Sequence, residues 1–179
     1  MSHSIKSTRT EDLDEAARAS VVRVCIAAHQ DEDFKNLFNY VTSDGWHFLA
    51  YHENELVSHA LVTTRWLQPE GQPLLKTAYI DAVATLPAYQ GQGYGSALMR
   101  QLASDIDDEY DIACLETERE TFYERLGWQT WRGPLAGRSE AGLIPNPEQS
   151  GIMILRLSKS PALDLDSLLS IECQTGRIW

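Results

Sequence analysis

The segment Gln90-Gly91-Gln92-Gly93-Tyr94-Gly95-Ser96 has the residue types and spacing that most directly predict chemistry in this sequence. Because glycine has no side chain, successive backbone N–H groups can point at one spot, and a helix N-terminus adds partial positive charge there. The segment follows a strand-like run and precedes a helical pattern, which is the position such a site requires. It therefore predicts a binding site for a diphosphate.

Two other phosphate-binding patterns fit this segment less well. The Walker A loop ends in Gly-Lys-Ser/Thr, whereas Ser96 is preceded by Tyr94 and Gly95 and no lysine is present. The dinucleotide fingerprint places its third glycine three residues after the second, whereas Gly95 follows Gly93 by two. A glycine-rich turn without a ligand remains an alternative, because helix N-termini need not hold anions.

The elements that must position this segment follow from hydrophobic periodicity and turn residues. Leu75 to Thr85 is rich in β-branched and aromatic residues, and apolar residues at every fourth position predict a helix from Gly93 to about Asp107. Asp12, with Glu15 three residues later, predicts the N-cap of a helix that extends to about Ala28. The other expected elements are strands at 5–8, 47–51, 56–66, 112–116, 128–131 and 152–157, helices at 33–40, 120–126 and 163–169, and a long loop at 133–151.

Length and composition indicate one globular α/β domain over residues 1–179, with a mixed, mostly antiparallel sheet and flanking helices. The net charge of −11 disfavours nucleic acid and anionic lipid as partners, and it suits either a cationic small molecule or solubility alone. Cys25, Cys114 and Cys173 lack metal or disulfide spacing and are expected to be free, buried thiols, so no metal is expected. No apolar run approaches the roughly 20 residues of a membrane span, and we expect a cytoplasmic protein.

Two motifs resemble those of the Gcn5-related N-acetyltransferases. Gln90-x-x-Gly93-x-Gly95 resembles their acetyl-CoA signature, and Phe122 to Trp128 resembles a second hallmark, a short helix that carries a tyrosine beside the thioester sulfur. The resemblance covers nearly the whole chain and implies this family's fold, with acetyl-CoA bound at the strand, loop and helix. The residues implied to bind it are Val83, Ala84, Thr85, Gln90, Gly91, Gln92, Gly93, Tyr94, Gly95 and Ser96.

The resemblance also implies a mechanism in which the amine attacks the thioester directly. Backbone N–H groups around Val83 would bind the thioester oxygen, and the Tyr123 hydroxyl would protonate the departing sulfur. Strand alternation would place the Asp81 side chain on the same face as Val83, where a carboxylate can anchor an ammonium group and take its proton. The alternatives are a core tyrosine at Tyr123 and a solvated strand acid at Asp81.

A narrower resemblance is to the aminoglycoside 2'-N-acetyltransferases. It rests on the Tyr79 to Ala84 run, on Gly133-Pro134 before a long loop, and on a chain that ends Gly176-x-x-Trp179, with residues 158–179 implied to be a tail lining the acceptor site. Asp81 stands for a longer Glu, and Ala82 for a Gly. Ser150 stands for an Asp, with Glu148 two residues away. The implied substrate contacts are Asp33, Asp81, Ala82, Glu148, Ser150 and Trp179.

The resemblance thus implies an enzyme that acetylates the 2'-amino group of an aminoglycoside, a small cationic amine, and it also implies a homodimer. Two alternatives stay open. The same fold can acetylate another cationic amine, such as a polyamine or a peptide N-terminus. A non-catalytic module that binds CoA or an aminoglycoside is the third possibility.

Overall fold

The computed structural model describes residues 4–179, and its internal contacts divide the chain into two compact units. The first unit comprises the described part of Met1–Thr63 together with Ile80–Asp105, and the second comprises Thr64–Tyr79 together with Ile106–Trp179. Two long strands, β3 (Glu55–Pro69) and β4 (Leu75–Thr85), each contribute residues to both units.

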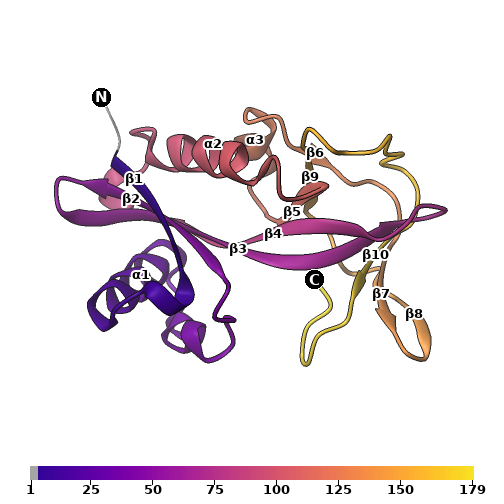
Figure 1. The fold of residues 1–179 in the computed structure, drawn as a ribbon, viewed down its shortest axis with the longest axis horizontal. Coiled ribbons are helices and arrows are strands. Elements are labelled where there is room, and N and C mark those ends of the chain that lie inside the picture. The colour runs from indigo at the N-terminus through magenta and orange to yellow at the C-terminus, as the bar shows by residue number, and fades with distance from the viewer. Residues whose placement is uncertain (1–3) are drawn as a thin grey trace. The chain divides into compact units, whose positions relative to one another are not determined.

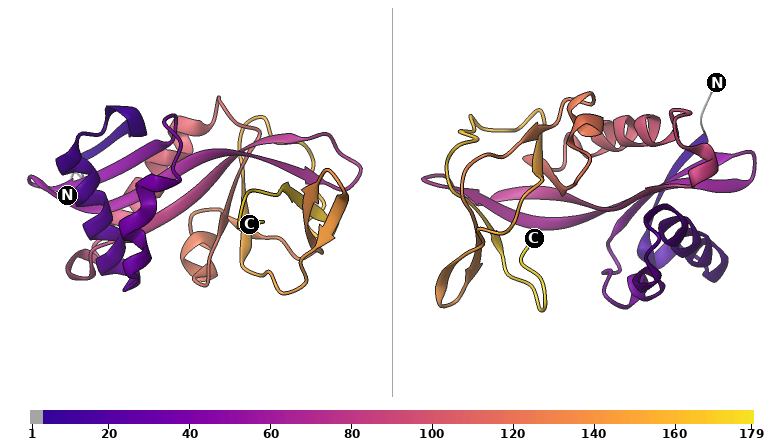
Figure 2. Two further views of the ribbon diagram at one scale, coloured as in Figure 1. Left: turned by 90° about the horizontal axis from the view of Figure 1, so that it is seen from below. Right: turned by 180° about the vertical axis from the view of Figure 1, so that it is seen from behind.

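The first unit is a sheet with a helix on each face (Figures 1 and 2). Strand β1 pairs antiparallel with β2, and β2 pairs antiparallel with the first half of β3, with His47 opposite Leu61. Helices α1 and α2 cover opposite faces of this sheet. The elements are β1 Ser4–Arg9, η1 Thr10–Asp12, α1 Glu15–His29, η2 Glu32–Asn39, β2 Trp46–His52, the unit's parts of β3 and β4, η3 Pro87–Tyr89 and α2 Tyr94–Ile106.

Helix α1 begins later than the sequence predicts. Its N-cap is Asp14, whose Oδ1 accepts from the Ala17 N–H at 2.8 Å, and Asp12 belongs to the preceding 3-10 turn. An N-cap residue has an extended backbone and a side chain that accepts from the third helical N–H. Asp14 meets both conditions, so the prediction of Asp12 as the N-cap is wrong. The expected helix at 33–40 is a 3-10 helix, η2, shifted by one residue.

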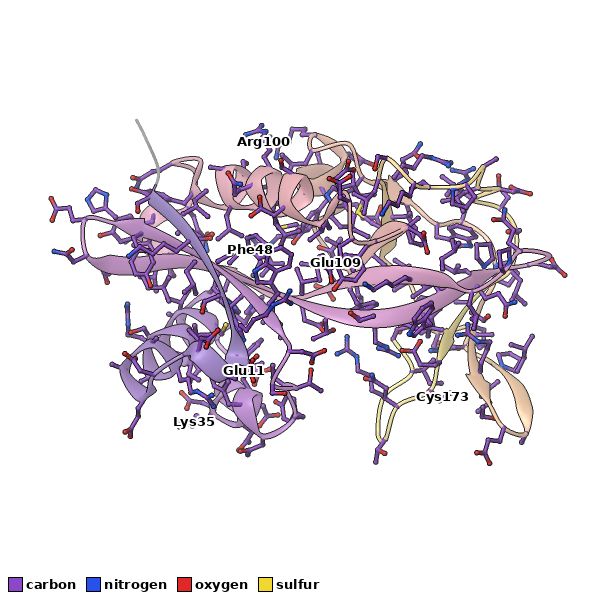
Figure 3. The ribbon with its side chains drawn as sticks, viewed as in Figure 1. Glu11, Lys35, Phe48, Arg100, Glu109 and Cys173 are labelled. Carbon is purple, nitrogen blue, oxygen red and sulfur yellow. The ribbon has the colours of Figure 1, made fainter. Side chains whose placement is uncertain are left out.

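Helix α2 confirms the four-residue repeat read from the sequence. Leu98, Leu102 and Ile106 are all fully buried, whereas Arg100 lies on the opposite face and is exposed. Figure 3 shows Arg100 on the side of α2 that faces away from the sheet, while Phe48 of β2 is enclosed. The apolar stripe thus positions the N-terminus of α2, where the glycine-rich segment ends.

The second unit is a sheet whose order is β6-β9-β5-β4-β3-β10-β7-β8, formed with its parts of β3 and β4. Strand β5 pairs antiparallel with β9, and β10 pairs antiparallel with β3 but parallel with β7, which makes the sheet mixed. Its remaining elements are β5 Ile112–Glu116, α3 Glu120–Glu124, β6 Gln129–Thr130, β7 Leu135–Ser139, β8 Gly142–Pro145, β9 Ile152–Arg156 and β10 Leu169–Glu172.

Two sequence predictions in this unit are wrong. Residues 163–169 form turns that lead into β10 and not a helix, because Leu169 pairs with both Leu135 and Pro69. The expected loop at 133–151 contains the antiparallel hairpin of β7 and β8. The two errors have different causes: the pairing partners of β10 lie far away in the sequence, and hydrophobic periodicity does not reveal the tight turn that joins β7 to β8.

The core of the second unit is apolar and includes Tyr79, Trp131 and Trp179. Cys25, Cys114 and Cys173 form no disulfide within residues 4–179; Cys25 and Cys114 are buried, as expected, whereas Cys173 is only partly buried. No helix in residues 4–179 is long and apolar enough to cross a membrane.

Candidate active site

The glycine-rich segment forms a turn directly before α2. Gly91 and Gly93 have φ angles of +73° and +88°, in the left-handed region that glycine adopts without strain. The Gly93 carbonyl accepts the Ala97 N–H at 2.9 Å, so the helix begins at this glycine. Residues 90–93 are exposed, so the turn that precedes the N-terminus of α2 is accessible to a ligand.

Two glutamine side chains hold this turn in shape. Gln90 Nε2 donates to the Thr85 carbonyl at 3.0 Å, and Gln92 Nε2 donates to the Ala88 carbonyl at 2.8 Å. Since both bonds close loops of four or five residues, they restrict the backbone before any ligand binds. The turn is therefore preorganised.

An aromatic cluster anchors the same turn to strand β2. The Tyr94 hydroxyl lies 2.6 Å from His52 Nδ1, and the Tyr89 ring packs edge-on against Tyr94 with ring centroids 5.7 Å apart. The Tyr89 hydroxyl donates to Glu55 Oε2 at 3.0 Å. These contacts fix the beginning of α2 against the hairpin of β2 and β3.

Strand β4 is distorted where it approaches the turn. Ala82 has a φ angle of +50°, which non-glycine residues rarely adopt, and Asp81, Ala82 and Val83 are all partly exposed. The prediction that Asp81 and Val83 share a face assumed regular alternation, and this assumption fails because a left-handed residue interrupts the pleat. A glycine at residue 82 would meet the same backbone requirement with less strain.

Buried histidines beneath this distortion were missed from the sequence. His59 Nδ1 lies 2.9 Å from the Ala82 carbonyl oxygen, His47 Nδ1 lies 3.0 Å from His59 Nε2, and Thr10 Oγ1 lies 3.0 Å from His47 Nε2. The strand register offered a signal: His47 pairs with Leu61, so His59, two residues before Leu61, lies on the same face as His47. Sequence reasoning did not pair these strands residue by residue.

Because His47 and His59 are buried, we expect the folded protein to lose stability as the pH falls. Burial lowers the pKa of His59 from its ordinary 6.5 to about 4, and burial, with the nearby His59 and Arg18 charges, lowers the pKa of His47 to about 3. The unfolded chain therefore binds protons first, so the stabilisation is complete above about pH 6.5 and is lost as the pH falls below it. We expect His59 alone to account for about 2 kcal/mol of lost unfolding free energy by pH 5.

Urea unfolding at pH 7.5, 6 and 5 tests this expectation, with His59→Asn as the control because asparagine does not titrate. The wild type should lose more stability than the variant between pH 7.5 and 5. Parallel losses in the two proteins would contradict the prediction.

In the second unit, Tyr123 lies in helix α3 and is 7% exposed. Its ring packs edge-on against Phe122 and Trp128, with centroid distances of 4.9 and 5.9 Å. Burial raises the pKa of Tyr123 to about 12, and the positive charge of Arg119 acts in the opposite direction. The hydroxyl is therefore protonated at neutral pH, as a general acid must be.

The residues predicted to contact the acceptor differ in exposure. Asp33 lies in the exposed first turn of η2, in the first unit, and Glu148 and Ser150 are exposed in the second. Trp179 is 5% exposed and belongs to the apolar core of the second unit, and its main-chain oxygen accepts from Arg177 Nε. The structure thus gives the Trp179 ring a packing role.

Each unit holds part of the predicted site. The first brings Asp81, Ala82 and the whole of 83–96 into one continuous strand, turn and helix, and it also carries Asp33. The second carries Tyr123, Glu148, Ser150 and Trp179. Within residues 4–179 no cluster of three or more His, Cys, Asp or Glu side chains has the arrangement of a metal site.

Comparison with known proteins agrees with the geometry of the strand, turn and helix. Residues 4–131 match the acetyltransferase (GNAT) domain family. The chain is 28% identical over 183 residues to an aminoglycoside 2'-N-acetyltransferase of Mycolicibacterium fortuitum, and the alignment covers 99% of this chain and 92% of the relative.

Solved structures share the fold at low sequence identity. A GNAT family N-acetyltransferase, YhbS of Escherichia coli, in complex with CoA, has a TM-score of 0.65 at 12% identity, covering 94% of this chain and 88% of that one. Eis1 of Mycobacterium abscessus has a TM-score of 0.59 at 20% identity, covering 70% of this chain and 31% of that one. The chain thus spans about a third of the length of Eis1, and the same is true of a GCN5-related N-acetyltransferase of Kribbella flavida and a probable N-acyltransferase of Enterococcus faecalis.

Proposed function

Since the chain belongs to the acetyltransferase (GNAT) domain family, we propose that it is an N-acetyltransferase that transfers the acetyl group of acetyl-CoA to the 2'-amino group of an aminoglycoside. The chain acts as one catalytic domain over residues 1–179. The observation that carries the donor assignment is the preorganised turn at 90–96, which opens α2 with two left-handed glycines. The pyrophosphate of acetyl-CoA binds to its backbone N–H groups.

The acceptor assignment has two supports. One is the 28% identity, over nearly its full length, to an aminoglycoside 2'-N-acetyltransferase. The other is the net charge of −11, which attracts a polycationic sugar. Asp33, Asp81, Ala82, Glu148 and Ser150 are the proposed acceptor contacts, together with Trp179, which would contribute through its main chain because its ring packs in the core.

In the proposed reaction the 2'-amine attacks the thioester carbon directly. The Val83 N–H stabilises the negative charge that develops on the thioester oxygen, and the Asp81 carboxylate anchors the ammonium and takes its proton, directly or through water. The C–S bond then breaks, and the Tyr123 hydroxyl protonates the CoA thiolate. This division of roles requires a protonated tyrosine. A tyrosine with its ordinary pKa of 10 is already protonated at neutral pH, and burial, which raises the pKa of Tyr123 to about 12, keeps it so.

Two aminoglycosides that differ at one position test the proposal. Kanamycin B carries a 2'-amine, and kanamycin A carries a hydroxyl there. With acetyl-CoA and the protein, mass spectrometry should show one added acetyl group on kanamycin B and none on kanamycin A. Equal acetylation of both would contradict the 2' assignment.

The same assay separates the two alternatives. Polyamines and a peptide with a free N-terminus should be acetylated with kcat/KM at least about tenfold below that of kanamycin B. A protein that binds CoA but transfers acetyl to no amine in this panel would instead be a binding module.

A further inference from the structure

We propose that His59 is a positioning residue that fixes the Ala82–Val83 peptide, so that the Val83 N–H faces the thioester oxygen. The inference rests on the proposed function and concerns a residue outside both sequence motifs. Its basis is one short contact, the 2.9 Å between His59 Nδ1 and the Ala82 carbonyl oxygen.

The hydrogen-bond chain behind His59 has only one consistent direction when both histidines are neutral. The Ala82 carbonyl can only accept, so His59 Nδ1 must donate and His59 Nε2 must accept. His47 Nδ1 then donates to His59, and His47 Nε2 accepts from the Thr10 hydroxyl. The Thr10 hydroxyl also lies 3.2 Å from the Gly45 carbonyl, but its single proton goes to His47 in this arrangement, and the Gly45 carbonyl accepts the Thr10 main-chain N–H at 2.9 Å.

Both histidines stay neutral at the pH where acetyl transfer takes place. His59 and His47 are fully buried, and burial is the main cause of their lowered pKa values of about 4 and 3. His59 therefore acts as a fixed neutral donor and does not exchange a proton with the amine. The orientation of the His59 ring is also fixed by its other nitrogen, since His59 Nε2 accepts a hydrogen bond from His47 Nδ1.

Peptide geometry carries this anchoring to the reacting group. The chain has no cis peptide in the described residues, and in a planar trans peptide the C=O and the following N–H point in opposite directions. Because His59 holds the Ala82 carbonyl on one side, the Val83 N–H must point to the other. His29 Nε2 lies 3.0 Å from the Val83 carbonyl, so the next peptide is held as well.

The Ala82 backbone explains why such an anchor is needed. A left-handed φ of +50° is unfavourable for a non-glycine residue, and such conformations persist where surrounding contacts enforce them. Cys25 Sγ lies 3.9 Å from the same Ala82 oxygen, a weak contact beside the stronger one from His59. Without His59, Ala82 is free to relax toward ordinary strand geometry and turn the Val83 N–H away.

The test compares His59→Leu with His59→Asn. Both variants remove the acceptor for His47, but only asparagine keeps an N–H donor in the place of Nδ1. We expect His59→Leu to lower kcat about tenfold while the KM values for acetyl-CoA and the amine change less than about twofold. We expect His59→Asn to restore most of kcat. If His59→Leu does not fold, His59→Ala, which also lacks a donor, takes its place in the comparison with His59→Asn.

Adding Ala82→Gly to His59→Leu should recover part of the lost kcat, because glycine adopts positive φ without strain. A merely structural loss at His59 would not respond to this change. Equal impairment of the leucine and asparagine variants, or full activity of His59→Leu, would overturn the proposal.

An infrared measurement separates this inference from the proposed function. The carbonyl stretch of bound acetyl-CoA, labelled with carbon-13, should shift to lower frequency in the wild type and in His59→Asn, and less in His59→Leu. The measurement needs no amine, so it decides the role of His59 even if no aminoglycoside is acetylated. An identical shift in all three proteins would rule out the positioning role.

Discussion

Replacing Tyr123 with phenylalanine is expected to lower kcat by about 100-fold or more, the usual contribution of a general acid. Phenylalanine keeps the edge-on contacts of the ring with Phe122 and Trp128, so the fold should be unaffected. What is lost is the hydroxyl proton, which the raised pKa of about 12 retains at neutral pH. Thiol release at saturating acetyl-CoA and amine measures the effect.

Tyr110→Phe is the matched control. Tyr110 is also a buried tyrosine of the second unit, and its hydroxyl bonds to Thr64 Oγ1 at 3.0 Å. This variant should keep the wild-type kcat, because its hydroxyl has a packing partner and no proposed role in the reaction. Similar losses in both variants, or an unchanged kcat in Tyr123→Phe, would show that Tyr123 is not the acid.

Replacing Gly93 with valine is expected to weaken the binding of CoA by roughly 30- to 100-fold. A β-branched residue resists the φ of +88° found at Gly93, and the backbone can relieve the strain only by moving the N–H groups of the turn away from the pyrophosphate. A loss of about 2–3 kcal/mol in binding free energy corresponds to this factor. Calorimetric titration with CoA gives the dissociation constant directly.

Gly71→Val provides the comparison for Gly93→Val. Gly71 has a φ of +74°, and nothing lies within 4 Å of the place its Cβ would take, so it carries comparable strain in a turn of the second unit. We expect a small loss of stability and no change in CoA affinity for this variant. Equal weakening of CoA binding by both substitutions would indicate a general effect of strain and not a loss of phosphate contacts.

Much of the fold was predictable because its signals are local. The glycines of the turn, the apolar stripe of α2 and the strand-like runs of β2, β3 and β4 each depend on residues a few positions apart. The same holds for the two motifs that indicate acetyltransferase chemistry. Their positions in the structure agree with the ranges expected from the sequence to within a few residues.

Several of the errors and omissions concern residues that are far apart in the sequence and meet only in the folded chain. Strand β10 exists because Leu169 pairs with Pro69 and Leu135, and no local pattern at 163–169 shows this. Strict alternation across Asp81 and Val83 fails because Ala82 is held in a left-handed conformation, which the sequence does not reveal.

The sequence by itself determined the proposed donor site, because a phosphate-binding turn needs only backbone conformation, glycine and the start of a helix within one short segment. The tertiary structure decided how the neighbouring part of strand β4 is held. His59 lies 23 residues from Ala82 in the sequence, and Thr10 lies 37 residues from His47. A hydrogen bond depends on the distance between its atoms in space. Only folding therefore brings Thr10, His47, His59 and the Ala82 carbonyl into one series of hydrogen bonds beneath β4.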